Sequence, residues 1–189
     1  AFFGIGGLSS KFRYGDKEAR GVAEGNDGAR GTGNVLANAA VALAAVLGFA
    51  VVDGTGPLAT GFLFAFCGSL ATALGDTLSS EIGGLFDDPR LITTLEPVAP
   101  GTDGAVTWQG ELAGLAGVTL TGLLSTAVLP LGMVWPAAAV VAGGGLCGIT
   151  VDSLLGATIE GGRLGNQWVN FLATLTGGLT SAGLAVWLL

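Results

Sequence analysis

The chain contains no histidine, so no imidazole can act as a general base or as a metal ligand. Its two cysteines, Cys67 and Cys147, both lie inside long apolar stretches, which excludes a disulfide framework and a cysteine-based zinc site. Charged residues make up 11% of the 189 residues. Because soluble domains average about 25%, this scarcity of charge also excludes an ordinary soluble domain.

Hydrophobic residues form half of the chain and gather in stretches without charge. A helix needs about 20 such residues to cross the hydrocarbon core of a bilayer. The sequence therefore predicts an all-α, polytopic transmembrane helix bundle that forms a single integral-membrane domain over residues 1–189. The expected spans are 35–52, 58–75, 112–131, 134–151 and 169–189.

Glycine is abundant, with 35 residues, and two pairs have the spacing that lets membrane helices approach closely. These pairs are Gly110 with Gly114 and Gly144 with Gly148. They predict a compact bundle. Residues 1–7 lack the basic region of a signal peptide and predict a partial helix before the first span.

Threading five spans through a bilayer divides the loops unequally. Residues 9–34, 76–110 and 152–168 fall on one side, and 53–57, 132–133 and the C-terminus fall on the other. All seven basic residues lie on the first side. The positive-inside rule predicts that this side is cytoplasmic, and it places a cytoplasmic, motif-bearing loop at 76–111 and the active face toward the cytoplasm of the cell.

Polar residues recur at the predicted cytoplasmic ends of the spans. Asn34 and Asn38 are four residues apart, as are Asn166 and Asn170, so each pair should lie on one helix face. Asp76 and the pair Asp152-Ser153 each follow directly on a span. Helix capping is the alternative interpretation for any one of these sites, but their recurrence on one side favours a shared polar interface.

Three carboxylates, those of Asp76, Glu81 and Asp152, stand at the predicted edge of the hydrocarbon, where an unpaired charge is costly. Oxygen-only clusters of this kind suit Mg²⁺, which takes one or two carboxylates together with water and substrate phosphates. We therefore expect these three residues to bind Mg²⁺.

A glycine-rich turn, 100–104, offers backbone amides to an anion through Gly101, Thr102 and Gly104. Lys11, Arg13 and Arg30 add cations suited to phosphate on the same face. Acids that hold a metal, an anion loop and cations together indicate phosphoryl transfer. Because histidine is absent, the favoured acceptor is a phosphate monoester, which with a second pKa near ~6 is already ionised at neutral pH.

Four ordered motifs resemble an integral-membrane family that includes phytyl-phosphate kinase, and the resemblance covers nearly the whole chain. The motifs are RGTGNVLAN at 30–38, GDTLSSEIG at 75–83, GTDGAV at 101–106 and DSLLGAT at 152–158. A second, distant resemblance is to dolichol kinase, which implies CTP as the favoured nucleoside triphosphate. In the phytyl-phosphate kinase family a basic residue often follows a Thr-Thr pair, whereas here Leu95 and Glu96 follow Thr94.

The resemblance implies specific roles. Asp76, Glu81 and Asp152 would bind the metal and the triphosphate, and Arg30 would join Asp76 and Asp152 in catalysis. The resemblance also implies that Arg30, Asn34, Asn38, Asn166 and Asn170 lie around phosphate or base, and that Ser79 and Ser80 line the same cleft. With Lys11, Gly101, Thr102, Gly104 and Ser153, which follow from the residues themselves, they complete the expected substrate-binding and nucleotide-binding set.

The predicted function is therefore an isoprenyl-phosphate kinase that acts on phytyl phosphate or, in an archaeal host, on geranylgeranyl phosphate. The expected partners are the lipid phosphate, the nucleotide and membrane lipids, without any nucleic-acid polymer. A CTP-dependent lipid cytidylyltransferase and a non-enzymatic membrane transporter are the alternatives. The sequence leaves open whether the bundle forms a homodimer.

Overall fold

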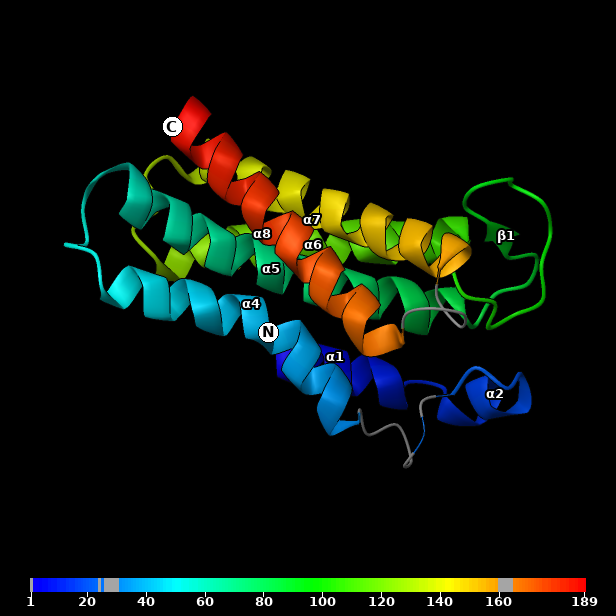
Figure 1. Cartoon of the computed structure of the whole chain (residues 1–189). Coiled ribbons are helices and arrows are strands. Elements are labelled where there is room, and N and C mark those ends of the chain that lie inside the picture. Colours follow the sequence, from blue (N-terminus) through cyan, green and yellow to red (C-terminus); the bar gives the residue numbers. More distant parts are fainter. Residues whose placement is uncertain (1, 24, 26–30, 160–164) are drawn as a thin grey trace.

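The computed structural model describes residues 2–23, 25, 31–159 and 165–189. Five long helices run along one another with alternating direction (Figure 1). Each is long and apolar enough to cross a membrane, which confirms the predicted helix bundle and its five spans. These helices are α4 (Thr32–Ala50), α5 (Gly56–Gly83), α6 (Trp108–Val128), α7 (Val134–Thr158) and α8 (Asn166–Leu188).

Among the described residues, the shorter helices α1 (Phe2–Lys11) and α2 (Tyr14–Ala19) precede the spans. The predicted partial helix corresponds to α1, which packs along α5. A left-handed residue, Arg13 (φ 49°), turns the chain from α1 into α2.

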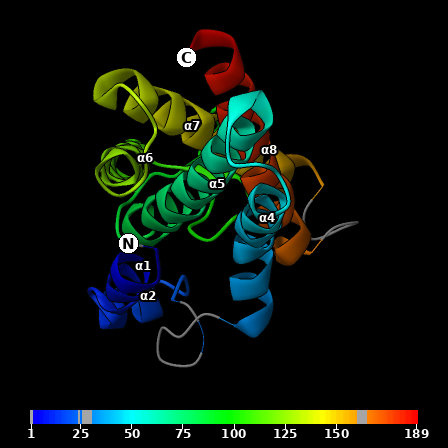
Figure 2. The same cartoon turned by 90° about the vertical axis from the view of Figure 1, so that its left-hand side faces the viewer.

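Helix α5 forms the centre of the bundle. It packs against α1, α4, α6, α7 and α8, and Figure 2 shows it surrounded by them. In its most apolar stretch, 56% of the residues are buried inside the protein, compared with 22% in the corresponding stretch of α4. A core that includes Phe64, Ala71, Val118 and Val141 fills the space between the central helices. The peripheral helices therefore keep large apolar faces toward the surrounding medium, as expected for spans in lipid.

Close helix contacts form where the glycine pairs predict them. A Cβ added at Gly110 would lie 2.7 Å from the Ser79 carbonyl oxygen on α5. One added at Gly144 would lie 2.7 Å from the Gly177 carbonyl oxygen on α8. Such distances leave no room for a side chain, so both motifs bring helix backbones into contact.

Helices α5 and α7 continue well past the predicted ends of their spans. The predicted spans end at residues 75 and 151, but α5 continues to Gly83 and α7 continues to Thr158. The expected loop 76–111 is therefore wrong at both ends, because 76–83 belong to α5 and 108–111 belong to α6. The extra turns are amphipathic: Gly83 packs on Gly110 of α6, while neighbouring polar residues line a cavity. A charged residue ends a hydropathy window without ending a helix.

The connection between α5 and α6 contains a small β-ribbon that the all-α prediction missed. Strand β1 (Arg90–Leu91) pairs antiparallel with β2 (Ala105–Val106). Further backbone hydrogen bonds close the segment between them, including those from Ile92 N to Gly104 O at 3.1 Å and from Val98 N to Pro89 O at 3.0 Å. The ribbon lies at the right-hand end of the bundle in Figure 1.

The four tryptophans lie at the two ends of the bundle, and each is at least 61% exposed. Trp108 and Trp168 stand at the starts of α6 and α8, whereas Trp135 and Trp187 stand at the opposite end. From Trp168 to Trp187 a helix rises about 28 Å, close to the ~30 Å hydrocarbon thickness. This placement matches the aromatic belts of membrane proteins and marks both limits of the apolar zone.

Candidate functional site

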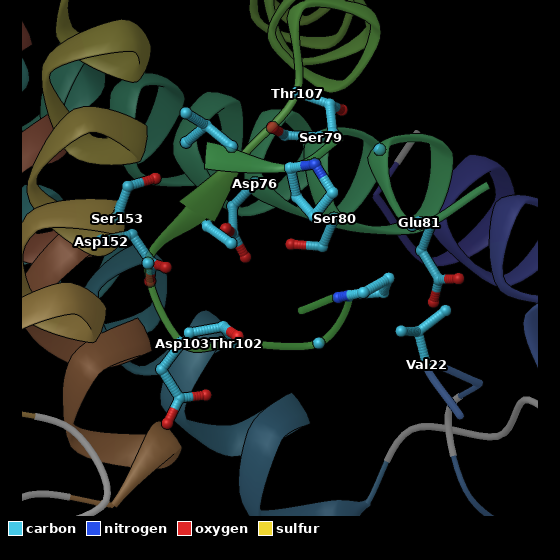
Figure 3. A pocket seen from close by; sticks show the side chains of 18 of the residues that line it. Val22, Asp76, Ser79, Ser80, Glu81, Thr102, Asp103, Thr107, Asp152 and Ser153 are labelled. Atoms are coloured by element: carbon cyan, nitrogen blue, oxygen red, sulfur yellow. The ribbon is translucent and has the colours of Figure 1, made fainter. Parts of the chain in front are cut away.

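A cavity of about 440 Å³ lies at the end of the bundle that carries the β-ribbon and α2 (Figure 3). Its walls come from the last turns of α5, the last turns of α7 and the first turns of α4 and α8. Residues 100–107, the segment 21–23 and the residues Gly84, Phe86 and Pro89 complete it. The motifs at 34–38, 76–81, 101–104, 152–153 and 166–170 are far apart in the sequence, and the fold gathers them around this space.

Most of the predicted site residues line this cavity. Lys11 does not: it is an exposed residue at the end of α1. Arg30 lies outside the residues that the structure describes. The residues that do line the cavity are Asn34, Asn38, Asp76, Ser79, Ser80, Glu81, Gly101, Thr102, Gly104, Asp152, Ser153, Asn166 and Asn170.

Asp76 and Asp152 project from neighbouring helices, and local packing sets their relative height. Gly75 lies against the side chain of Ile149, because a Cβ at Gly75 would be 2.5 Å from Ile149 Cδ1. Asp76 comes directly after this contact on α5, and Asp152 comes one helical turn after it on α7. In Figure 3 the Asp76 side chain and the neighbouring Ser80 hydroxyl point into the cavity.

Glu81 occupies a different environment. Its Oε1 accepts a hydrogen bond from Ser10 Oγ at 2.6 Å, and its Oε2 pairs with Lys17 Nζ at 2.5 Å. Figure 3 shows Glu81 turned toward α1 and α2, away from Asp152. Within the described part of the chain, no three acidic or cysteine side chains are grouped so that they could hold a metal ion. The expected cluster of three carboxylates is therefore not formed, and Asp76 and Asp152 stay as the predicted metal ligands.

The two asparagine pairs line the cavity from the first turns of α4 and α8. Asn38 Nδ2 donates to Asn34 O at 2.9 Å, and Asn170 Nδ2 donates to Asn166 Oδ1 at 2.5 Å. The N-cap positions belong to glycines, Gly31 and Gly165, without a side-chain cap. Capping therefore does not explain the asparagines, which supports the prediction of a shared polar interface.

The loop at 101–104 is pressed onto α7. Gly101 and Gly104 have φ angles of 81° and 73°, a region that favours glycine. A Cβ at Gly104 would lie 2.5 Å from Ser153 O and 2.3 Å from Ala157 N. The amide of Thr102 donates to Ala99 O at 3.2 Å, so this amide holds the turn itself and not an anion. The predicted hydrogen bonds to an anion would therefore come from the other backbone amides of the loop.

Several lining residues were missed from the sequence. Asp103 adds a further carboxylate, and Thr107 caps α6 by accepting a hydrogen bond from Gly110 N at 3.1 Å. Its place between Gly101 and Gly104 in the GTDGAV motif could have identified Asp103 as a site residue from the sequence. The segment Gly21 to Ala23 carries no chemical motif, and only the packing of α2 brings it to the cavity. No lysine or arginine of the described ranges lines the cavity, whose charged side chains are all acidic.

Comparison with known proteins decides the family. Residues 1–178 match the family model described as "Integral membrane protein DUF92". The chain belongs to this family. An uncharacterized membrane protein of Methanocaldococcus jannaschii is 39% identical over 185 residues, which cover 95% of this chain and 71% of the relative.

Two further relatives come from photosynthetic organisms. An uncharacterized membrane protein of Synechocystis sp. is 32% identical over 195 residues, covering 97% of this chain and 71% of the relative. The protein named VTE6, chloroplastic, of Arabidopsis thaliana is 34% identical over 175 residues, which cover 90% of this chain and 50% of that relative. No solved structure matches the chain.

Proposed function

We propose that this protein is an isoprenyl-phosphate kinase, which transfers the γ-phosphate of a nucleoside triphosphate to a lipid monophosphate such as phytyl or geranylgeranyl phosphate. The observation that carries the proposal is the polar cavity described above, in which residues of the four motifs converge at one end of a membrane bundle. Similarity to VTE6 and the motif resemblance to the phytyl-phosphate kinase family support it.

The donor chemistry of the cavity fits Mg²⁺. Asp76 and Asp152 offer two carboxylates from adjacent helices, and Ser80 offers a hydroxyl beside Asp76. Mg²⁺ is commonly held by one or two carboxylates and keeps water and phosphate oxygens as its other ligands. When bound to Asp76 and Asp152, Mg²⁺ would supply the positive charge that offsets the negative charge of the nucleotide phosphates.

The charge of the cavity also supports a cation requirement. Asp76, Asp103 and Asp152 line it, and no described lysine or arginine does. A polyphosphate would be repelled by these carboxylates in the absence of a divalent cation. Arg30 lies outside the described residues, and the motif at 30–38 is the ground on which we propose that it contacts the transferring phosphate.

Asn34, Asn38, Asn166 and Asn170, which we call the asparagine wall, suit the binding of the lipid phosphate that accepts the transferred group. The starts of α4 and α8 place the partial positive charge of two helix dipoles beside the amides of Asn34 and Asn166. A lipid phosphate is already ionised at neutral pH, so these groups need only bind and orient it. The cavity wall near Asn166 lies at the level of Trp168, where the phosphate of a membrane lipid also lies.

The membrane orientation is part of the proposal. Every described basic residue belongs to the end of α1, to α2 and its flanks, or to β1, all at the cavity end of the bundle. By the positive-inside rule this distribution supports a cavity on the cytoplasmic face, where nucleotides are abundant. The five long helices are continuous through the apolar zone, which gives no support to a transporter built on broken helices.

The experiment that tests the proposal is a transfer assay in detergent with Mg²⁺, phytyl or geranylgeranyl phosphate, and each nucleoside triphosphate labelled at the α- or γ-phosphorus. A kinase transfers the γ-label to a lipid diphosphate and releases a nucleoside diphosphate. Transfer of the α-label with release of pyrophosphate would identify a cytidylyltransferase instead. A folded protein that transfers neither label to either lipid, with any nucleotide, would refute the kinase.

A further inference from the structure

The segment that follows α2 is anchored by a buried ion pair. Lys17 is 1% exposed, and its Nζ donates to Ser9 O at 2.9 Å, Ser10 O at 2.7 Å and Glu81 Oε2 at 2.5 Å. An ammonium group has three donors, so all of its hydrogen-bonding capacity is used. Ser10 occupies the second oxygen of Glu81. The burial of this charge is tolerable because the whole network is satisfied.

Two further contacts continue from this anchor toward the cavity. Arg20 Nη1 pairs with Asp87 Oδ1 at 2.8 Å, just beyond the end of α5. Val22 packs against two glycines: a Cβ added at Gly84 would lie 3.6 Å from Val22 Cβ, and one added at Gly101 would lie 3.3 Å from Val22 Cγ1. We call residues 17–23 the strap. Its last residues, 21–23, line the cavity.

We propose that Lys17 and Glu81 are positioning residues whose buried ion pair holds the strap against the end of α5 and the 101–104 loop, so that residues 21–23 form one wall of the cavity. Glu81 then acts through the strap and binds no metal. Figure 3 shows Val22 beside Glu81, on the side of the cavity opposite Asp152. The activity readout below rests on the proposed kinase, but the labelling readout does not.

Thiol labelling tests the position of the strap without any assay of function. In a Cys147→Ser background, which removes the exposed cysteine, Val22→Cys reports how often the strap leaves its contacts. Adding Glu81→Gln or Lys17→Met should speed maleimide labelling at position 22 by roughly tenfold or more, because each change breaks a buried pair. Unchanged labelling in both variants would overturn the proposal.

Two controls keep this labelling result interpretable. Asp16→Asn breaks the exposed pair of Arg13 and Asp16 at the start of α2, and it should leave the labelling rate unchanged. The double variant Lys17→Met with Glu81→Gln removes both charges at once, so it leaves no unpaired buried charge and should be at least as stable as either single variant. Its labelling should still be fast; slow labelling in the double variant would contradict an anchor made by the ion pair.

A disulfide staple distinguishes positioning from metal binding. The 3.6 Å separation at positions 22 and 84 matches the Cβ–Cβ distance of a disulfide, so Val22→Cys with Gly84→Cys should cross-link on oxidation. In a Glu81→Gln chain, the oxidised staple should restore the kcat/KM that the substitution lowers, and reduction should remove the gain. The Mg²⁺ concentration for half-maximal activity should stay that of the unsubstituted protein.

Failure to rescue, together with a raised Mg²⁺ requirement in Glu81→Gln, would overturn the proposal and return Glu81 to the metal site. If the unsubstituted protein transfers no phosphate at all, the proposed kinase fails, and the labelling rates decide the strap by themselves. The two failures are therefore distinguishable.

Discussion

Asp76 and Glu81 are carboxylates of the same helix, less than two turns apart, and the structure gives them opposite surroundings. Asp76 is half-buried and faces the cavity between α5 and α7. Glu81 is 5% exposed, and both of its oxygens are engaged by Ser10 and Lys17. The difference teaches that the position of an acid at a membrane boundary does not reveal its role, because its surroundings decide whether the side chain faces a cavity or is held in a buried ion pair.

The largest effect is expected at Asp76. Asp76→Asn keeps the shape of the side chain but removes the charge proposed to hold Mg²⁺, so transfer should fall roughly 10³-fold or more. Asp53→Asn, at the opposite end of the bundle, is the matched control and should keep full activity. Initial rates with labelled nucleotide measure both. Near-normal turnover in Asp76→Asn would sink the metal assignment.

A smaller loss is expected where the loop meets α7. In Gly104→Ala the new Cβ would collide with Ser153 O at 2.5 Å, and displacement of the loop by about 1 Å should cost roughly 10²-fold in kcat/KM. Gly132 has a similar φ of 84° and open space around it, so Gly132→Ala separates backbone strain from the collision. Equal losses of kcat/KM in the two variants would show that the contact between the 101–104 loop and α7 does not matter for activity.

Substitutions in the ion pair of Glu81 and Lys17 should lower activity less. Glu81→Gln and Lys17→Met are each expected to lower kcat/KM by about tenfold, through movement of the strap. Because both act on one ion pair, their combined effect should be close to that of one alone. Kinetics of the two single variants and the double variant complete the cycle. Fully multiplicative losses would contradict a shared mechanism.

The smallest effect is expected on the asparagine wall. Asn34→Ala or Asn166→Ala removes one neutral hydrogen-bonding group, which should raise the KM for the lipid phosphate by about five- to tenfold. The KM for the nucleotide should change little, because the nucleotide is assigned to the acidic side. Saturation curves for each substrate at a fixed level of the other measure the split. A selective rise in the KM for the nucleotide would show that the asparagine wall binds the nucleotide and that the acidic side binds the lipid phosphate.

Much of the fold was predictable because lipid imposes a simple rule on sequence. A span must satisfy its backbone internally and present apolar side chains, so charge-free stretches located all five helices. The ends of the helices were not predictable in the same way. Asp76 and Glu81 interrupt the apolar pattern while the backbone of α5 continues to Gly83, since packing on α6 and α1 stabilises the extra turns.

The residues of the candidate site were predictable where a short sequence motif by itself indicates their chemistry. Asp152, Asn166 and the Gly101 turn were found as motifs, and the fold brings them to one cavity. Lys17 could not be distinguished from an ordinary positive-inside residue, because its buried partner is 64 positions away along the chain. Val22 carried no signal of any kind.

The sequence by itself determined that this chain is a membrane bundle with its polar groups at one end, because hydrocarbon excludes charge wherever the chain crosses it. Only the tertiary structure decided which polar groups face one another. It assigned Asp76 to the cavity and Glu81 to Lys17, since contacts between distant segments depend on how helices pack. Helix packing is set by the glycines and small side chains of many spans together.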